Sequence, residues 1–367
     1  MSMSEKRIIL AVTNDLVADQ RIQRISASLA QEGHQVTVVG RISPRKPQTQ
    51  YHPNVVCDRL HIPFQRGWLF YACFNVRLFF HLLFSKADLL CANDADTLLA
   101  VGLVSKIRGI PFIYDSHEYF TEVPELAHKP LVKKSWHLIQ KYFVPKAKAC
   151  MTVGSALAEE LSRVYGKKFQ VVRNAAKERP APLAQKLPIL LYQGVLNKGR
   201  GLEQCIDAME TLTDLELWIV GRGDIEDQLK RQVQQKQLSN VRFLGFVPPE
   251  ELRQITDQAW LGLNLLDSSS LNYHFSLANK WFDYLQAEVV SLHMTLPEYV
   301  RLRQEYGVGV LIEQLETTAL IQSVRELQIN TSLYEDQLQH IRHAKKLLNW
   351  EHESKSLVQI YRDSLLG

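Results

Sequence analysis

The chain has 367 residues and a mass of 42.2 kDa, and at about 150 residues per domain this length favours two domains. Hydrophobic residues make up 46% and charged residues 22%, close to the globular average, which excludes a disordered, fibrous or collagen-like chain. Lys and Arg total 43 against 39 for Asp and Glu, and the net charge of +4 is too small to indicate a nucleic-acid-binding protein.

The five cysteines form no C-x-x-C pair, which argues against a disulfide framework and a zinc site and favours a reducing cytoplasm. Residues 1–7 are polar and lack the apolar core of a signal peptide, so we expect no export. The most apolar long stretch, 68–84, is interrupted by Asn75, Arg77 and His81, so we expect a helix that does not cross a membrane.

The first half of the chain alternates short apolar runs with segments of helical periodicity. The expected strands are 8–13, 36–39, 88–91, 112–114, 149–153 and 170–172, and the expected helices are 19–32, 69–84, 95–108, 133–143 and 155–163. A strand, a helix and a second strand within 8–39 require a parallel sheet with a right-handed crossover. We therefore predict a doubly wound α/β domain over residues 1–176.

Residues 177–188 (KERPAPLAQKLP) hold three prolines and four charged residues without periodicity, which is typical of an exposed interdomain linker. The alternation then restarts and predicts a second parallel-sheet domain over 189–349. Its expected strands are 189–193, 215–220, 241–244 and 261–265, and its expected helices are 202–210, 225–235 and 249–259. We expect a terminal helix within 350–367, packed back on the first domain. Two such domains predict a cleft between them that binds the ligand.

Two loops of the second domain combine glycine with basic residues at strand ends. The first, ILLYQGVLNKGRGLE, has Lys198 and Arg200 between its glycines and leads into a helix. The second, LWIVGRGD, repeats the design one unit later. Glycines let backbone N–H groups approach an anion, and a helix N-terminus with Lys or Arg adds positive charge, so the loops favour a nucleotide-diphosphate site. The alternative is a pair of ordinary strand–helix turns.

A third segment, LNLLDSSSLNYHFSLANKWFDY, predicts a strand, a polar loop and a helix that begins near Leu277. Lys280 and Asp283 are three residues apart and share one face of that helix. A cation for phosphate and a carboxylate for the ribose hydroxyls then point at one nucleotide. The alternative is a solvated ion pair, which contributes little.

These segments, in this order, resemble family 4 of the retaining GT-B glycosyltransferases. The basic glycine loop, LWIVGRGD, VRFLGFVPPEEL and NKWFDY resemble that family's donor domain. In the first half, DQRIQRISASLAQEGHQVTVVG is similar to the family's first helix and second strand. IPFIYDSHEYF is similar to a strand followed by a D-x-H-E segment, and VVRNAA is similar to the turn before the linker. The resemblance covers nearly the whole chain and implies the GT-B fold, with two doubly wound, Rossmann-like domains facing a cleft.

By this resemblance, Arg200 and Lys280 would bind the diphosphate of a nucleotide sugar, with Lys198 as a second candidate. Asp283 would hold the ribose, and His117 would face the donor sugar or its leaving oxygen. Such cations stabilise the negative charge that grows on the leaving diphosphate. The other candidate donor-binding residues are Gly194, Gly199, Gly221, Gly223, Asn272 and Asn279. GT-B enzymes work without a bound metal, and no D-x-D in a loop typical of a metal site and no His/Cys cluster is found, so we expect no metal or cofactor.

The sequence also departs from the family's pattern. Phe275 stands where the family usually has the first of two glutamates eight positions apart, and Asn272 or His274 would have to substitute for it. Val195 replaces the first Arg of the usual G-R-L loop, and Glu288 replaces the Gly of A-G-x-P. These changes leave the sugar open and raise the chance of weak activity. On the N-terminal side, Asp19 and Arg21 are expected to form a buried ion pair at a helix start, and the alternative is that they help to shape the cleft.

Two acid-free segments suggest a surface for anionic lipid. Residues 128–150 carry six lysines among aromatic and aliphatic residues, and residues 59–86 are rich in aromatic residues. Such a pattern predicts a peripheral protein on the inner face of the membrane, with a lipid-linked acceptor. The alternative is a solvated lysine face over a domain core.

The leading hypothesis is therefore a cytoplasmic, retaining, metal-independent glycosyltransferase that moves a sugar from a nucleotide diphosphate sugar to a saccharide or lipid-linked acceptor. A nucleotide-sugar 2-epimerase of the same architecture and a catalytically silent GT-B scaffold remain alternatives. A dinucleotide-dependent dehydrogenase is disfavoured because G-x-G-x-x-G does not follow the first strand.

Overall fold

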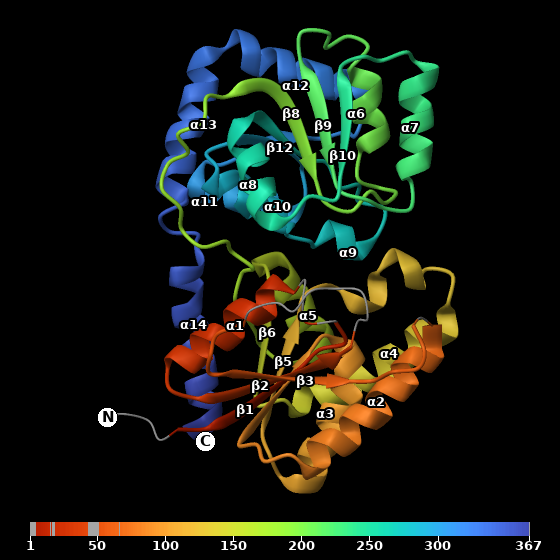
Figure 1. The fold of residues 1–367 in the computed structure, drawn as a ribbon, viewed down its shortest axis with the longest axis vertical. Coiled ribbons are helices and arrows are strands. Elements are labelled where there is room, and N and C mark those ends of the chain that lie inside the picture. Colours follow the sequence, from red (N-terminus) through yellow and green to blue (C-terminus); the bar gives the residue numbers. More distant parts are fainter. Residues whose placement is uncertain (1–4, 15, 17–18, 43–50, 66, 367) are drawn as a thin grey trace. The chain divides into compact units, whose positions relative to one another are not determined.

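The computed structural model describes residues 5–14, 16, 19–42, 51–65 and 67–366. The chain divides into two compact units (Figure 1). Unit 1 comprises Met1–Asn174 with His352–Gly367, and unit 2 comprises Ala175–Glu351. Each unit has its own parallel sheet, so the prediction of two doubly wound α/β domains is confirmed.

Unit 1 contains a seven-stranded parallel sheet in the order β3-β2-β1-β4-β5-β6-β7. Its strands are β1 (Arg7–Ala11), β2 (Gln35–Arg41), β3 (Val55–Leu60), β4 (Leu89–Asn93), β5 (Phe112–Ser116), β6 (Ala149–Thr152) and β7 (Phe169–Val171). The strand order reverses between β1 and β4. In open α/β sheets, the carboxyl ends of strands at such a reversal are where ligands bind.

Helices cover both faces of this sheet: α2, α3 and α4 lie on one face and α1 and α14 on the other (Figure 1). The helices are α1 (Gln20–Gln31), α2 (Gly67–Phe84), α3 (Ala95–Arg108), α4 (Pro130–Phe143), α5 (Ser155–Tyr165) and α14 (Trp350–Leu366), with short 3-10 turns at 120–122, 124–126 and 144–146. Strand β3 was missed by the sequence analysis. It is an edge strand of mixed polarity and partial exposure, so it has neither an apolar run nor a clear alternation.

Unit 2 contains a six-stranded parallel sheet in the order β10-β9-β8-β11-β12-β13. Its strands are β8 (Leu187–Gln193), β9 (Glu216–Val220), β10 (Val241–Gly245), β11 (Ala259–Asn264), β12 (Val290–Met294) and β13 (Val310–Ile312). Its helices are α6 (Leu202–Ala208), α7 (Glu226–Gln235), α8 (Pro249–Gln258), α9 (Leu271–His274), α10 (Asn279–Gln286), α11 (Pro297–Tyr306), α12 (Thr317–Ile329) and α13 (Thr331–Ala344).

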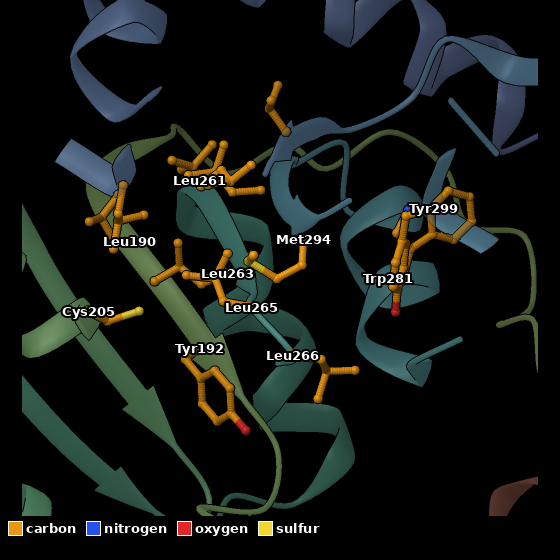
Figure 2. Packing of buried hydrophobic residues seen from close by; sticks show 14 of the residues in the cluster. Leu190, Tyr192, Cys205, Leu261, Leu263, Leu265, Leu266, Trp281, Met294 and Tyr299 are labelled. Carbon is orange, nitrogen blue, oxygen red and sulfur yellow. The ribbon is translucent and has the colours of Figure 1, made fainter. Parts of the chain in front are cut away.

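The core of unit 2 lies on both faces of the central strands β8 and β11. Leu190 and Tyr192 of β8 point into one apolar cluster with Leu261 and Leu263 of β11, and Trp281 of α10 closes it (Figure 2). The alternate residues Ile189 and Leu191 pack in a second cluster on the opposite face. Because both faces are covered, the strand reads as an unbroken apolar run, which is why the sequence revealed it.

Most residues of the segment predicted as an exposed linker are exposed, and two of its basic side chains bind to unit 2. Residues 177–186 form no helix or strand, but they belong to unit 2, and β8 begins at Leu187. Arg179 forms an ion pair with Asp257, and Lys186 Nζ donates to the carbonyls of Asp257 and Ala287, each at 2.9 Å. These contacts hold the segment to unit 2, where Lys186 satisfies two backbone carbonyls that need donors.

Candidate functional site

The glycines of the two predicted phosphate loops pack the loops against each other. A Cβ on Gly221 would lie 1.8 Å from the Gly194 carbonyl oxygen, and a Cβ on Gly223 would lie 2.3 Å from that of Leu196. Gly194 N also donates to Val220 O at 2.9 Å. Gly221 and Gly223 therefore have a packing role that the sequence analysis did not foresee, and they hold the loop after β9 against the loop after β8.

Lys280 occupies the first turn of α10 and is only 7% exposed. Its Nζ lies 3.6 Å from the centroid of the Tyr192 ring, a cation–π contact. A Cβ on Gly194 would come within 3.4 Å of this Nζ. Gly194 thus leaves the ammonium group open on the side of the loop.

Arg200 also lies near Tyr192, because its positive charge acts on the Tyr192 hydroxyl and on Lys280. Its guanidinium carbon lies 5.4 Å from the centroid of a second ring, that of Tyr273. Burial, reinforced by the charge of Arg200, lowers the pKa of Lys280 well below its ordinary value. Among the residues that the structure describes, neither cation has a carboxylate within 4.0 Å, and Arg200 Nε is buried without a hydrogen-bond partner. Two cations that repel each other in a partly dry site are suited to an anion with more than one charge.

A buried network fixes the start of α10 and so the position of Lys280. The Tyr299 hydroxyl accepts from Ala278 N at 3.0 Å and from Asn264 Nδ2 at 2.8 Å. His293 stacks on the Tyr299 ring with centroids 4.7 Å apart, and burial, with a smaller effect of Lys280, lowers the pKa of His293 to about 3. These residues come from three elements, and no local pattern in the sequence could have revealed them.

Asp283, one turn further along α10, is oriented by a chain of hydrogen bonds. Gln193 Nε2 at the end of β8 donates to Asp283 Oδ2 at 2.8 Å, and Thr256 Oγ1 donates to Gln193 Oε1 at 2.8 Å. Gln193 is 3% exposed, so its amide is held in place. The structure therefore brings the predicted ribose-binding carboxylate to the same strand end as Lys280.

The remaining predicted donor residues lie on the loops around this cluster. Lys198 is exposed, and its carbonyl oxygen accepts from the Tyr273 hydroxyl at 3.5 Å. A Cβ on Gly199 would lie 2.7 Å from Asp267 Oδ2, so Gly199 too is constrained by packing. Asn272 is buried on α9, and Asn279 is exposed at the start of α10. Tyr273 was missed because an aromatic residue in a polar loop carries no recognisable signal.

The replacement of glycine by Glu288 has a structural explanation. Glu288 has a φ of 50°, in the left-handed region that favours glycine. Its carboxylate accepts from Lys345 Nζ and from Arg342 Nε, both at 3.0 Å. These two bonds compensate for the backbone strain, so this departure from the family's pattern leaves the turn after α10 intact.

In unit 1, His117 follows β5 and is enclosed by two carboxylates. Its Nδ1 lies 2.9 Å from Asp94 Oδ2, and its Nε2 lies 3.0 Å from Asp115 Oδ2. Although burial opposes it, these two charges raise the pKa of His117 well above its ordinary value. Both ring nitrogens therefore face carboxylates of unit 1, an arrangement that favours the charged form of the ring.

The carboxylates around His117 have distinct states. Asp115 is fully buried and also accepts from Arg21 Nη2 at 2.8 Å, so Arg21 pairs with Asp115, whereas Asp19 caps α1. Asp94 has a φ of 63°, and such strain clusters at functional sites.

Asp96 accepts from Thr13 Oγ1 at 2.6 Å, and burial raises its pKa to about 8.

The residues Asp94, Ala95 and Asp96 form a D-x-D that the sequence analysis had not singled out. A metal ion needs both carboxylates ionised, whereas burial raises the pKa of Asp96 to about 8 and Asp94 is bound to His117. Within the described ranges, no group of three or more His, Cys, Asp and Glu side chains is arranged to hold a metal ion.

Comparisons with known proteins agree with this architecture. Residues 18–177 match the family model described as Glycosyltransferase Family 4, and residues 174–266 match the model described as Glycosyl transferases group 1. A search of curated proteins found no match.

Among solved structures, sucrose-phosphate synthase from Thermosynechococcus elongatus is similar with a TM-score of 0.75 at 17% identity, over 98% of both chains. Anabaena HepE in complex with UDP and glucose has a TM-score of 0.75 at 13% identity, over 98% of this chain and 100% of that one. A glycosyltransferase from Rickettsia africae has a TM-score of 0.75 at 12% identity, over 100% of both chains. Two glycosyltransferase family models match successive parts of the chain, and together with the shared fold they support a GT-B glycosyltransferase.

Proposed function

We propose that this chain transfers a sugar from a nucleotide diphosphate sugar to a saccharide or lipid-linked acceptor, with retention of configuration and without a metal ion. The observation that carries the proposal is the pair of cations, Arg200 and Lys280, that converge on Tyr192 without a carboxylate partner among the described residues. The glycosyltransferase family matches support transfer of a sugar.

The two cations suit the chemistry of a departing nucleotide diphosphate. As the glycosidic bond breaks, its electron pair moves to the diphosphate oxygen, and that oxygen gains negative charge. Preorganised cations in a site of low dielectric stabilise this charge more than they stabilise the ground state. The bound anion also favours the protonated form of Lys280, whose pKa is lowered in the free protein.

A uridine diphosphate sugar is the first donor to test, because the similar Anabaena protein was solved with UDP and glucose. Asp283 would hold the ribose hydroxyls, since Gln193 orients its carboxylate at the strand end that carries Lys280. His117 would act on the donor sugar or its leaving oxygen through its positive charge and not as a base, because an imidazolium with both N–H groups donated cannot take up a proton.

Calorimetric titration with UDP, GDP and ADP in the presence of EDTA tests the diphosphate site. We expect one nucleotide to bind without a metal ion and both Arg200→Gln and Lys280→Met to weaken it. The exposed Lys346 provides a matched control in the same unit, because Lys346→Met removes the same charge outside the cluster. Nucleotide binding that neither cluster variant weakens would remove the proposed clamp.

Turnover separates a transferase from a binding protein. The NMR spectrum of the product formed from the nucleotide sugar that binds best gives its anomeric configuration. Retention would support the full proposal and inversion would contradict its stereochemistry. Interconversion of the donor with its 2-epimer, without an acceptor, would favour an epimerase instead.

A further inference from the structure

The helices α2, α3 and α4 of unit 1 form one continuous layer. Asn75 of α2 donates through Nδ2 to the Asp96 carbonyl of α3 at 2.7 Å. The rings of Tyr71 on α2 and Trp136 on α4 meet edge to face at 5.6 Å. The three helices lie side by side in Figure 1. Their outward residues therefore belong to one surface.

This outer surface is apolar to an unusual degree. On α2 the residues 69, 72, 76 and 80 are exposed at helical spacing and so form one stripe. Trp68 is 71% exposed and Phe84 is 80% exposed, values typical of charged residues. The exposed large apolar residues of the layer are Trp68, Leu69, Val76, Phe80, Phe84, Leu103, Ile107, Leu131, Val132, Leu138 and Tyr142.

By length and composition, α2 is the one helix among the described residues that could cross a membrane. The core helix of a soluble protein passes the same test, but such a helix is mostly buried, and only 28% of α2 is buried. The side chain of Asn75 bonds to α3 on the inner side of α2. An apolar helix that is packed on one side and exposed on the other is suited to the plane of a membrane interface.

The same layer carries positive charge and few carboxylates. No Asp or Glu occurs in residues 59–86, 97–114 or 128–158. Of the carboxylates near these segments, Asp58 lies 3.3 Å from His81 and Glu122 lies 2.8 Å from Lys133, whereas Glu125 is exposed. The exposed cations within the segments are Arg77, Lys86, Lys106, Arg108, Lys129, Lys134, Lys141, Lys146 and Lys148.

We propose that this surface, the docking face of α2, α3 and α4, binds an anionic lipid bilayer. The aromatic and aliphatic residues enter the boundary between headgroups and acyl chains, and the lysines meet the lipid phosphates. Charge complementarity favours anionic lipid over a second copy of the chain, because two such cationic faces would repel each other. The proposal goes beyond glycosyl transfer and depends on unit 1 alone.

Sedimentation of the full chain with lipid vesicles tests the proposal. We expect binding to vesicles of equimolar phosphatidylcholine and phosphatidylglycerol, little binding to phosphatidylcholine alone, and loss of binding as salt increases. The variant Lys134→Glu/Lys141→Glu should bind at least about 30-fold more weakly, because it removes two cations worth about 1 kcal/mol each and adds two repelled carboxylates. The variant Trp68→Ser/Phe84→Ser should also weaken binding while preserving the salt dependence.

A charge-matched control is available on other parts of unit 1. Lys168 follows α5 and Lys355 lies on α14, and both are exposed, so Lys168→Glu/Lys355→Glu makes the same change of net charge outside the docking face. Equal binding to both vesicle types, or equal losses in the two lysine variants, would overturn the proposal. Self-association that depends on Trp68 and Phe84, without vesicle binding, would identify a second copy as the partner. Nucleotide binding, measured on the same variants, should stay unchanged and reports separately on the proposed function.

Discussion

Replacing Lys280 by Met should stabilise the free protein and at the same time weaken its binding of a nucleotide diphosphate. Lys280 is 7% exposed, and its one described aromatic contact is with Tyr192. Burial of an ion costs several kcal/mol, and a desolvated cation–π contact returns about 2 kcal/mol. Met fills a similar volume without charge, so we expect Lys280→Met to raise the free energy of unfolding by about 1–4 kcal/mol. The melting temperature should rise by about 2–4 °C for each kcal/mol.

The gain should depend on pH in a definite direction. The pKa of Lys280 is lowered in the folded state, so the folded protein takes up this proton less readily than the unfolded chain, in which the ordinary value is 10.5. The penalty is complete below the folded pKa and disappears as pH rises through the range up to the unfolded pKa. The advantage of Lys280→Met should therefore be largest at neutral pH and shrink at alkaline pH.

Thermal unfolding across this pH range, with and without UDP, measures both effects. With UDP present, the parent should be more stable than Lys280→Met. Loss of one partner of a buried charge pair costs about 2–5 kcal/mol of binding free energy, which raises Kd by about 30- to 4000-fold. A variant that is less stable than the parent at neutral pH, or whose gain does not change with pH, would refute the reasoning.

Three further outcomes follow from the packing and charges. Gly221→Ala should destabilise unit 2 by about 2–4 kcal/mol in urea unfolding, because its Cβ would overlap the Gly194 carbonyl; an unchanged midpoint would contradict this packing. Glu288→Gln should cost about 3–5 kcal/mol by the same assay, since Lys345, which is 5% exposed, loses its charged partner. Asp94→Asn should lower the raised pKa of His117, and NMR titration of its ring should show the imidazolium lost at lower pH than in the parent. A His117 titration that does not move would exclude Asp94 as a source of the shift.

Much of the fold could be predicted because its central strands are buried on both faces. Runs such as Ile189–Tyr192 are apolar, and glycines mark the loops that follow them. The edge strand β3 has no such signal, since its side chains are partly exposed and mixed in polarity. The partners of Arg179 and Lys186 in the predicted linker could not be foreseen, because proline and charge look the same whether or not the side chains find partners.

The candidate site was predicted in its residue types and not in its contacts. Arg200 and Lys280 stood out because cations beside glycines suit phosphate. Tyr192, which both cations approach, reads only as one more core residue of β8. The enclosure of His117 by Asp94 and Asp115 joins two strand ends, and it depends on a register that a single sequence does not contain.

Proton uptake on diphosphate binding tests the central claim most directly. Calorimetric titration of the chain with UDP at about pH 8, where UDP is fully ionised, is repeated in buffers of different ionisation enthalpy to count the protons exchanged. Because the anion raises the lowered pKa of Lys280, we predict a net uptake of protons that increases with pH and disappears in Lys280→Met. Binding with no uptake, or an uptake that persists in Lys280→Met, would contradict an account in which this buried cation receives the diphosphate.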